Sequence, residues 1–444
     1  MKPPPFVVHS SGRYLARSGG TPFFYLADTA WEIFHRANLE EADHYFRIRG
    51  EQGFTVVQAT ALPEFGGLHV PNYYGERPLH DDDPTRPNDG YFKHVDMLLD
   101  RAAWNGLTVA LLPAWGDKWH RIHDLWGAKV IFTPENALAY GRWIGTRFAE
   151  RDNLIWVLGG DRPVGNDTHR EINRALARGL REGDGGRHLI TFHPYGGRSS
   201  AEDFHEEPWL DFNMAQSGHT GHDFGNHAMI ERDYARQPVK PCLDAEPCYE
   251  DHPVMGAKWS HEASDWFDAY EVRKRAYWAV FAGAFGHAYG AHSVWQWWDR
   301  SRERVNHVRT PWREALQLPG AKQMRHLRAL MESRPFFERV PDQSLLTQPA
   351  GERGSHRRAT RAGDGSYALI YSPDGQPFEV RLNALSGVQV ATGWFNPRTG
   401  GFTANGTQPR TEVATFVPPE AGFDWVLVID DAIRNFPAPG PAPK

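Results

Sequence analysis

Short runs of apolar residues alternate along the chain with longer stretches in which apolar positions recur every three or four residues. The short runs are rich in β-branched and aromatic residues, as strands are, and the longer stretches have the period of a helix. This alternation predicts parallel strands that are each followed by a helix. The eight predicted strands are residues 23–28, 54–60, 107–113, 154–160, 188–193, 210–217, 239–247 and 292–298.

Helical patterns lie between most of these strands, and several end at a glycine or at Asn-Gly, as helix C-caps do. Eight strand–helix units predict a (β/α)8 TIM barrel, class α/β, over residues 20–338, after an N-terminal segment of residues 1–19. The segments between the fifth, sixth and seventh strands are short, so the strand count is least secure there. The predicted helices are residues 39–52, 91–106, 135–150, 168–182, 262–284 and 319–333.

The hydrophobic pattern changes near residue 339. Short alternating runs, broken by Pro-Asp-Gly, Asn-Pro and Gly-Gly, predict a small antiparallel all-β sandwich over residues 339–432. The proline-rich residues 433–444 predict a disordered tail. A chain of 444 residues exceeds what one hydrophobic core usually serves, which agrees with a large domain followed by a smaller one.

Charge and composition exclude several classes of partner. The net charge is −6, with no long run of one sign, so we expect neither a nucleic acid nor a membrane surface as partner. The N-terminus carries three prolines where a secretion signal has an apolar stretch, which predicts a cytoplasmic protein, or a periplasmic or secreted one if a leader has been removed. Cys242 and Cys248 lie six residues apart in an extended segment, and we expect free thiols. The oligomeric state is not indicated.

The residues that close the strands matter most, because the active site of such a barrel lies at the C-terminal ends of its strands. The 17 tryptophans and the aromatic share of 13% fit either an aromatic-lined cleft, on which sugar rings stack, or a tryptophan-rich core. Strand-end position gives the candidate substrate-binding residues Asp28, Gln58, Trp115, His193, Gln216, Asp244 and Trp297.

Two carboxylates stand out among the strand ends. Asp161, in "NLIWVLGGDRP", closes the fourth predicted strand, and Glu246 closes the seventh. Glycosidic bonds are usually cleaved by two carboxyl groups, which retaining barrel glycosidases commonly carry on strands four and seven. We interpret Gly159 and Gly160 as room for an approaching ligand. The alternatives are a tight turn whose aspartate caps the next helix or pairs with Arg162, and an ordinary acidic edge around Glu246.

Other candidates allow two interpretations each. Asp28 either binds a substrate hydroxyl or caps a helical turn, and Trp115, with Trp119, either stacks on sugar or fills the core. Asp244 shares a strand face with Glu246, which would place two carboxylates in one mouth, although it could instead bond to backbone. His219 and His222 have only weak metal-ligand spacing, and no motif supplies a third ligand, so neither a metal nor another cofactor is expected.

Several long motifs carry a family resemblance. The stretches "GRYLARSGGTPFFYLADTAWEIFHR", "LLPAWGDKW", "IWVLGGDRP" and "LDAEPCYE" resemble glycoside hydrolase family 140, the apiosidase-like barrels often followed by a β-sandwich. The resemblance covers about residues 6–432. It implies that the chain releases β-linked apiose from plant glycans such as pectin or from apiosylated glycosides.

The resemblance also implies that Asp161 is the acid/base and Glu246 the nucleophile of a retaining, exo-acting hydrolase. The sandwich of relatives has been labelled collagen-binding by similarity, and nothing in residues 341–432 indicates that partner. The alternatives are an exo-glycosidase for another furanose such as arabinofuranose, a carbohydrate-binding barrel without catalysis and, more remotely, a barrel metallohydrolase.

Overall fold

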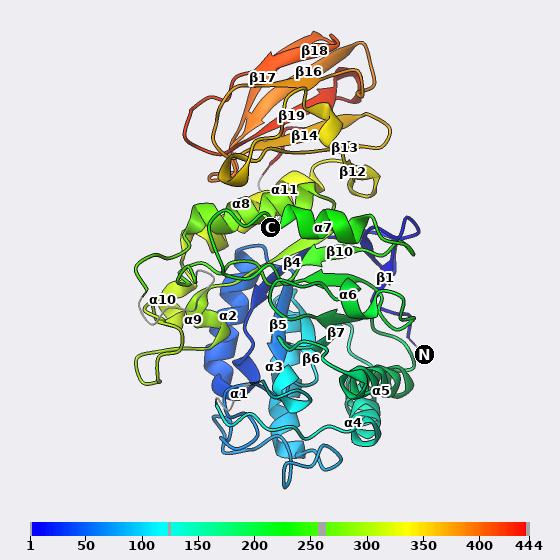
Figure 1. Cartoon of the computed structure of the whole chain (residues 1–444), viewed down its shortest axis with the longest axis vertical. Helices are drawn as coiled ribbons and strands as arrows, with labels where there is room; N and C mark the ends of the chain where they lie inside the picture. The colour runs from blue at the N-terminus through cyan, green and yellow to red at the C-terminus, as the bar shows by residue number, and fades with distance from the viewer. Residues whose placement is uncertain (1, 123–125, 256–262, 441–444) are drawn as a thin grey trace.

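The computed structural model describes residues 2–122, 126–255 and 263–440. Its first domain is a barrel of eight parallel strands, in the order β8-β7-β6-β5-β4-β11-β10-β9 (Figure 1). The circle closes between β8 and β9 through side-chain and backbone bonds, since the Thr191 hydroxyl donates to the carbonyl of Phe212 at 2.7 Å. The strands are β4 (Tyr25–Thr29), β5 (Val56–Thr60), β6 (Thr108–Leu112), β7 (Leu154–Gly159), β8 (Ile190–His193), β9 (Asn213–Ala215), β10 (Cys242–Asp244) and β11 (Gly286–Tyr289).

Helices follow the strands as the sequence pattern predicts, and their ends carry the expected capping residues. Asn38 and Glu41 form a capping box at the start of α2, and Thr133 and Asn136 form another at α4. The predicted helix over 262–284 starts later, because Asp268 caps it, and residue 262 lies outside the described residues. The helices are α1 (Ile33–Arg36), α2 (Leu39–Glu51), α3 (Asp89–Trp104), α4 (Pro134–Phe148), α5 (Asp167–Asp184), α6 (Ala201–Phe204), α7 (His227–Tyr234), α8 (Ala269–Phe281), α9 (His292–Trp295), α10 (Trp312–Ala315) and α11 (Pro319–Glu332).

The eighth strand lies earlier than predicted. Residues 292–298 were expected to be a strand, but their first part forms α9, and the strand is the preceding "GHAY" of β11. Small residues explain the error, because Gly286 and Ala288 give β11 none of the β-branched character that marks a buried strand. A Cβ atom on Gly286 would lie 2.2 Å from the carbonyl oxygen of Tyr25, so the close approach of β4 requires this glycine.

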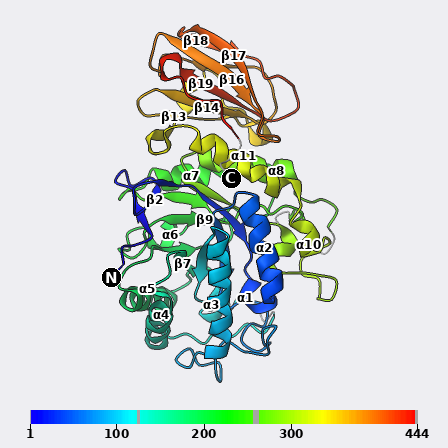
Figure 2. The ribbon, with the colours of Figure 1, turned by 180° about the vertical axis from the view of Figure 1, so that it is seen from behind.

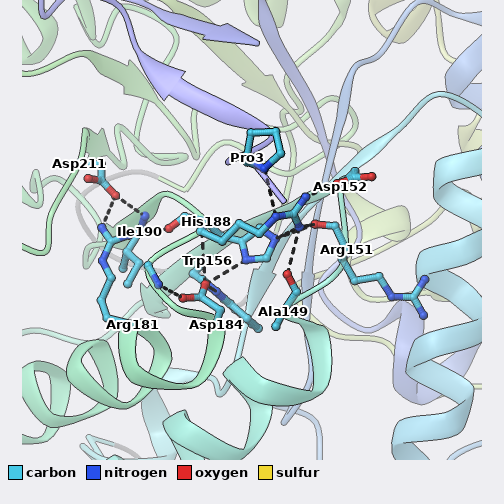
Figure 3. A network of polar contacts seen from close by, with 12 residues as sticks. Pro3, Ala149, Arg151, Asp152, Trp156, Arg181, Asp184, His188, Ile190 and Asp211 are labelled. Atoms are coloured by element: carbon cyan, nitrogen blue, oxygen red, sulfur yellow. Dashed lines mark hydrogen bonds and ion pairs between the residues drawn. The ribbon is translucent and has the colours of Figure 1, made fainter. Parts of the chain in front are cut away.

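The N-terminal segment forms a small antiparallel sheet of β1 (Phe6–Val8), β2 (Leu15–Arg17) and β3 (Pro22–Phe23). Arg187 binds this segment by donating to the carbonyl of Pro3 at 3.2 Å. The same arginine belongs to a polar network before β7 and β8, at the end of the barrel opposite the strand ends that carry the candidate residues (Figure 3). At its centre the carboxylate of Asp184 accepts from Trp156 Nε1 and His188 Nδ1, each at 2.9 Å.

The second domain is a β-sandwich, which confirms the predicted fold class. One sheet has the order β12-β13-β14-β19-β16-β17, and β15 and β18 form the other. Its core contains Trp394, Leu427 and Ile429. The strands are β12 (Arg339–Pro341), β13 (Arg358–Ala362), β14 (Tyr367–Ser372), β15 (Phe378–Arg381), β16 (Gln389–Phe395), β17 (Phe402–Pro409), β18 (Val413–Phe416) and β19 (Trp425–Asp431).

The sandwich packs on α8 and α11, along one side of the barrel (Figures 1 and 2). The guanidinium of Arg273 on α8 donates to both carboxylate oxygens of Asp424, at 2.6 and 2.8 Å, and Tyr277 stacks on Tyr371 with ring centroids 4.9 Å apart. Every residue of α8 from Glu271 to Phe281 is buried. The helix therefore belongs to the interiors of both domains.

The segment expected to be a disordered tail makes contacts as far as Pro437. Arg334 donates to the carbonyl of Pro437 at 2.9 Å, and its guanidinium lies 5.1 Å from the ring centroid of Phe436. Within the part of the chain that the structure describes, every helix is too short or too polar to span a lipid bilayer.

Candidate functional site

Three consecutive residues at the end of β7 adopt positive φ angles: Gly159 at 90°, Gly160 at 98° and Asp161 at 51°. A Cβ atom on Gly159 would lie 2.2 Å from the carbonyl oxygen of His193, and one on Gly160 would lie 2.7 Å from the amide nitrogen of Gly116. The glycines therefore let this turn pass close to neighbouring backbone, and the interpretation that they make room for a ligand is wrong. Nor does Asp161 cap the next helix, since the N-cap of α5 is Asn166.

Glu246 lies two residues beyond β10 and is surrounded by nitrogen atoms. The side-chain amide of Gln216 donates to Oε1 of Glu246 at 3.0 Å. His193 Nε2 lies 3.1 Å from Oε2, and His219 Nε2 lies 3.4 Å from Oε1. Gln216 also lowers the pKa of Asp161, so its amide lies close to both acids.

The two carboxyl groups have opposite proton affinities. Burial and the neighbouring Glu246 raise the pKa of Asp161 to about 6, against the opposing effects of Arg162 and His193. Burial would also raise the pKa of Glu246, but the imidazoles of His193 and His219 outweigh it and hold that pKa well below its usual range. The pair therefore places a protonated acid beside an ionised carboxylate in mildly acidic solution.

Buried polar atoms without hydrogen-bond partners gather beside these acids. Among the described residues, the atoms without one include Trp115 Nε1, His193 Nδ1, Gln216 Oε1 and the Tyr249 hydroxyl. Buried polar atoms in proteins are nearly always hydrogen-bonded, so this group of unpaired ones indicates a site built for a ligand with donors and acceptors of its own. Trp31 completes the wall, with its ring centroid 5.2 Å from that of Trp115 and 5.3 Å from that of His193.

Asp28 does not belong to this group. Its Oδ2 accepts from the Tyr45 hydroxyl at 2.7 Å and from Arg49 Nε at 2.6 Å, both on α2 outside the barrel. Side chains alternate along a strand, and the neighbouring Thr29 points inward to Gln58, so Asp28 faces out. Both interpretations of Asp28 are wrong, because α1 has Glu32 at its N-cap.

Trp297 also lies away from the site. It stacks on Trp312 with ring centroids 4.2 Å apart and contacts Tyr45. Because β11 ends at Tyr289, Trp297 is not at a strand end, and its prediction as a pocket wall is wrong.

Asp244 points out of the barrel, like Cys242 on the same strand face, whose thiol contacts the carbonyl of Ile230 on α7. Its Oδ2 accepts from the Ser217 hydroxyl at 2.6 Å and from Asn226 at 2.8 Å. The expectation of two carboxylates from this strand in one mouth is therefore wrong. Asp244 instead fixes the chain directly after Gln216.

Gln58 is fully buried inside the barrel below the mouth. Its amide donates to the Thr29 hydroxyl at 3.1 Å and to the carbonyl of Ala245, the residue before Glu246, at 2.9 Å. Trp119 donates from Nε1 to the carbonyl of Gly159 at 3.3 Å. Both side chains thus support the backbone that carries a candidate acid.

The two histidines considered for a metal face different partners. His222 lies 2.6 Å from Asp265 and 3.2 Å from Glu271, whereas His219 faces Glu246. Sequence reasoning assigned no role at the site to Glu64 or Tyr249. Glu64 lies in the loop after β5, with its Oε1 2.8 Å from Nη2 of Arg162. Tyr249 is buried, and its ring centroid lies 4.6 Å from that of His219. The only available signal was their position just beyond strand ends.

Comparison with family models gives two matches. A model described as "Apiosidase-like, catalytic domain" matches residues 9–338. A second, described as "Putative collagen-binding domain of a collagenase", matches residues 340–430. A comparison with curated proteins gave no match.

Solved structures resemble the whole chain. A structure titled "Glycoside hydrolase" is 33% identical, with a TM-score of 0.88, and 97% of each chain is covered. A glycoside hydrolase family 5 structure from Bacteroides vulgatus ATCC 8482 is 32% identical, with a TM-score of 0.87, covering 96% of this chain and 93% of that one. A third, from the same bacterium, is 15% identical with a TM-score of 0.70, covering 96% and 82%, and shares the fold.

Proposed function

The chain belongs to the apiosidase-like family of glycoside hydrolases, and from this premise we propose that it releases terminal β-linked apiose from plant glycans or apiosylated glycosides. We assign Asp161 as the acid/base and Glu246 as the nucleophile of a retaining reaction, as in glycoside hydrolase family 140. The observation that carries the proposal is the adjacent pair of carboxyl groups at the ends of β7 and β10, whose pKa values are displaced in opposite directions.

The surroundings of the pair suit a single sugar ring. The Glu246 side chain is 10% exposed and that of Asp161 33%, so the acid lies nearer to solvent, on the side from which a leaving group departs. The unpaired atoms of Trp115, His193 and Gln216 offer hydrogen bonds to hydroxyl groups. An enclosed nucleophile with such neighbours supports exo action on a terminal residue.

In the reaction, protonated Asp161 transfers its proton to the glycosidic oxygen while a carboxylate oxygen of Glu246 attacks the anomeric carbon. The bond to the aglycone breaks with its electron pair, and a glycosyl ester of Glu246 forms. Asp161, now ionised, takes a proton from water, whose oxygen attacks the anomeric carbon and releases Glu246. Gln216 donates to Glu246 and lies beside Asp161, between the two acids.

Hydrolysis of p-nitrophenyl β-D-apioside and p-nitrophenyl α-L-arabinofuranoside by the wild type, Asp161→Asn and Glu246→Gln tests the proposal. We expect turnover of the apioside by the wild type and near-complete loss with Glu246→Gln. Asp161→Asn should lose far more activity on an alkyl apioside than on the nitrophenyl one, since a good leaving group needs little protonation. Turnover of the arabinofuranoside alone would contradict the sugar assignment. An active Glu246→Gln would contradict the nucleophile, and full activity of Asp161→Asn on the alkyl apioside would contradict the acid/base.

The stereochemical assignment has its own measurement. Proton NMR of the sugar first released should show the anomeric configuration of the substrate. The inverted anomer as first product would exclude the covalent intermediate on Glu246.

A further inference from the structure

Arg162 lies between the proposed acid/base and a second carboxylate. Its Nη2 donates to Oε1 of Glu64 at 2.8 Å, and its Nη1 donates to the backbone carbonyl of Asp161 at 2.8 Å. The same Nη1 is 3.5 Å from Oδ2 of Asp161, beyond an ordinary hydrogen bond between charged groups. Glu64 therefore holds the guanidinium on the backbone of Asp161 rather than on its carboxyl group.

The aliphatic part of the Arg162 side chain is also held in place. A Cβ atom on Gly116 would lie 2.6 Å from Cγ of Arg162, so the arginine packs directly on this glycine. The nearby Asp117 is bound by Lys118 Nζ at 2.6 Å, and the same ammonium donates to the carbonyl of Pro63 at 2.8 Å. Asp117 is thus paired with Lys118, whereas Glu64 is paired with Arg162.

We propose that Glu64 is a positioning residue for the acid/base: by binding Arg162, it holds the cation on the backbone of Asp161 and away from the carboxyl group that donates the proton. This inference rests on the role proposed for Asp161. The titratable groups that face Asp161 are Glu246, Arg162 and His193, and those that face Glu64 are Arg162, Asp117 and Asp161.

The pKa values of Glu64 and Asp161 agree with this role. Burial raises the pKa of Glu64 to about 7, against the opposing charge of Arg162. This value lies above the pKa of about 6 of Asp161, so Glu64 is mostly neutral where Asp161 titrates, and it acts by restraining the cation that would stabilise a negative charge on Asp161. Removing the Glu64 oxygen that accepts from Arg162 frees the guanidinium to approach the Asp161 carboxyl group, which lowers the pKa of Asp161. Removing Arg162 instead raises it.

The test is the pH dependence of kcat/KM on an alkyl β-apioside, whose poor leaving group requires the acid. We expect Glu64→Ala, which removes the acceptor of Arg162, to move the basic limb of the profile downward by about one pH unit, and Glu64→Gln, which keeps an oxygen acceptor, to move it less. Arg162→Met should move it upward, and a purely structural role predicts no such opposite displacements. The matched control is Glu207→Ala, which removes a carboxylate 2.6 Å from Arg174 on the outside of the barrel and should leave the limb unchanged.

The outcomes separate this inference from the proposed function. A basic limb that stays in place in Glu64→Ala, in a variant with an unchanged melting temperature, would overturn the inference. If Glu64→Ala does not fold, Glu64→Asp, whose shorter side chain withdraws the acceptor from Arg162, takes its place: a downward shift of the limb supports the inference, and an unmoved limb overturns it. If Asp161→Asn keeps the basic limb, the acid/base assignment itself fails. If the sugar assignment fails, the same profiles on the glycoside that is hydrolysed test Glu64.

Discussion

Nε2 of His219 is directed at Oε1 of Glu246 across 3.4 Å, and the opposite side of the imidazole fixes its tautomer. There Nδ1 accepts the backbone N–H of Tyr249 at 3.3 Å, so the ring carries its proton on Nε2, towards the carboxylate. His219 therefore donates to Glu246 and stabilises the ionised carboxylate.

His219→Ala should raise the pKa of Glu246, because one of the two imidazoles that hold it down is lost. The reaction needs this group ionised, so the acid limb of the kcat/KM profile should move to higher pH by about one unit. The control His222→Ala, three residues away and bound to Asp265, should leave that limb in place. Equal shifts in both variants would show that the effect does not come from the contact with Glu246.

Gly160→Ala should impair both stability and activity. The new Cβ would approach the amide nitrogen of Gly116 to 2.7 Å at a φ of 98°, so the turn that carries Asp161 must move. We expect a lower melting temperature and a fall in kcat/KM of about 100-fold, since small displacements of a catalytic group are costly. Gly186→Ala is the matched control, because φ there is also positive, at 72°, but no atom lies within 4 Å of the new Cβ. A Gly160→Ala enzyme with the kinetics of that control would contradict the steric argument.

Asp184→Asn should destabilise the barrel by about 3 kcal/mol, because it weakens a buried pair with His188 and leaves that histidine uncompensated. Burial would raise the pKa of Asp184, but its bonds to His188 and Trp156 outweigh burial and lower it. The ionised group therefore contributes stability above the ordinary aspartate pKa, and this contribution is lost as pH falls through the lowered value. Urea unfolding at pH 7 and pH 3 should show a smaller acid destabilisation in Asp184→Asn. Asp152→Asn, in the same network but largely exposed, should behave like the wild type at both pH values.

Asp424→Asn should destabilise the contact between the two domains by about 3 kcal/mol, since Arg273 would keep its charge with a weaker partner in a buried site. Chemical unfolding measures the loss, and kcat/KM at 25 °C should not change, because α8 meets the sandwich away from the two acids. Asp364→Asn removes a charge from an exposed pair with Arg434 and serves as the control. Equal stability of the two variants would mean that the buried pair contributes no more than the surface one.

The sequence pattern located the strands well because parallel barrel strands are buried on both faces and form continuous apolar runs. The same property hid the direction of each side chain. Asp28 and Asp244 close their strands as Asp161 and Glu246 do, yet both face outward to helices. Asp161 and Glu246 lie just past the regular strand, where the chain has left the strict alternation. To predict which acids face the barrel interior, one would need to know, for each strand, at least one residue whose side chain points inward.

The sequence pattern failed to point to Glu64 for a different reason. Glu64 acts through Arg162, and the two are 98 positions apart along the chain. Only the barrel, by bringing the loop after β5 beside the turn after β7, makes them neighbours. The eighth strand was predicted at the wrong place for a local reason. Gly286 and Ala288 are small residues of low strand propensity, and at Gly286 only a glycine fits beside the neighbouring strand.

The burial of α8 from Glu271 to Phe281 between the two domains limits how the gene can recombine. A recombination event that cut the gene after codon 338 would give the barrel an uncovered helix with Tyr277 and Trp278 on its surface, and would leave Arg273 without its carboxylate. Exchange of sandwiches between such enzymes is therefore restricted to partners that present an acid at the position of Asp424 and an aromatic ring at that of Tyr371. We therefore expect the sequences of the barrel and the sandwich to be inherited together and to change together at this contact.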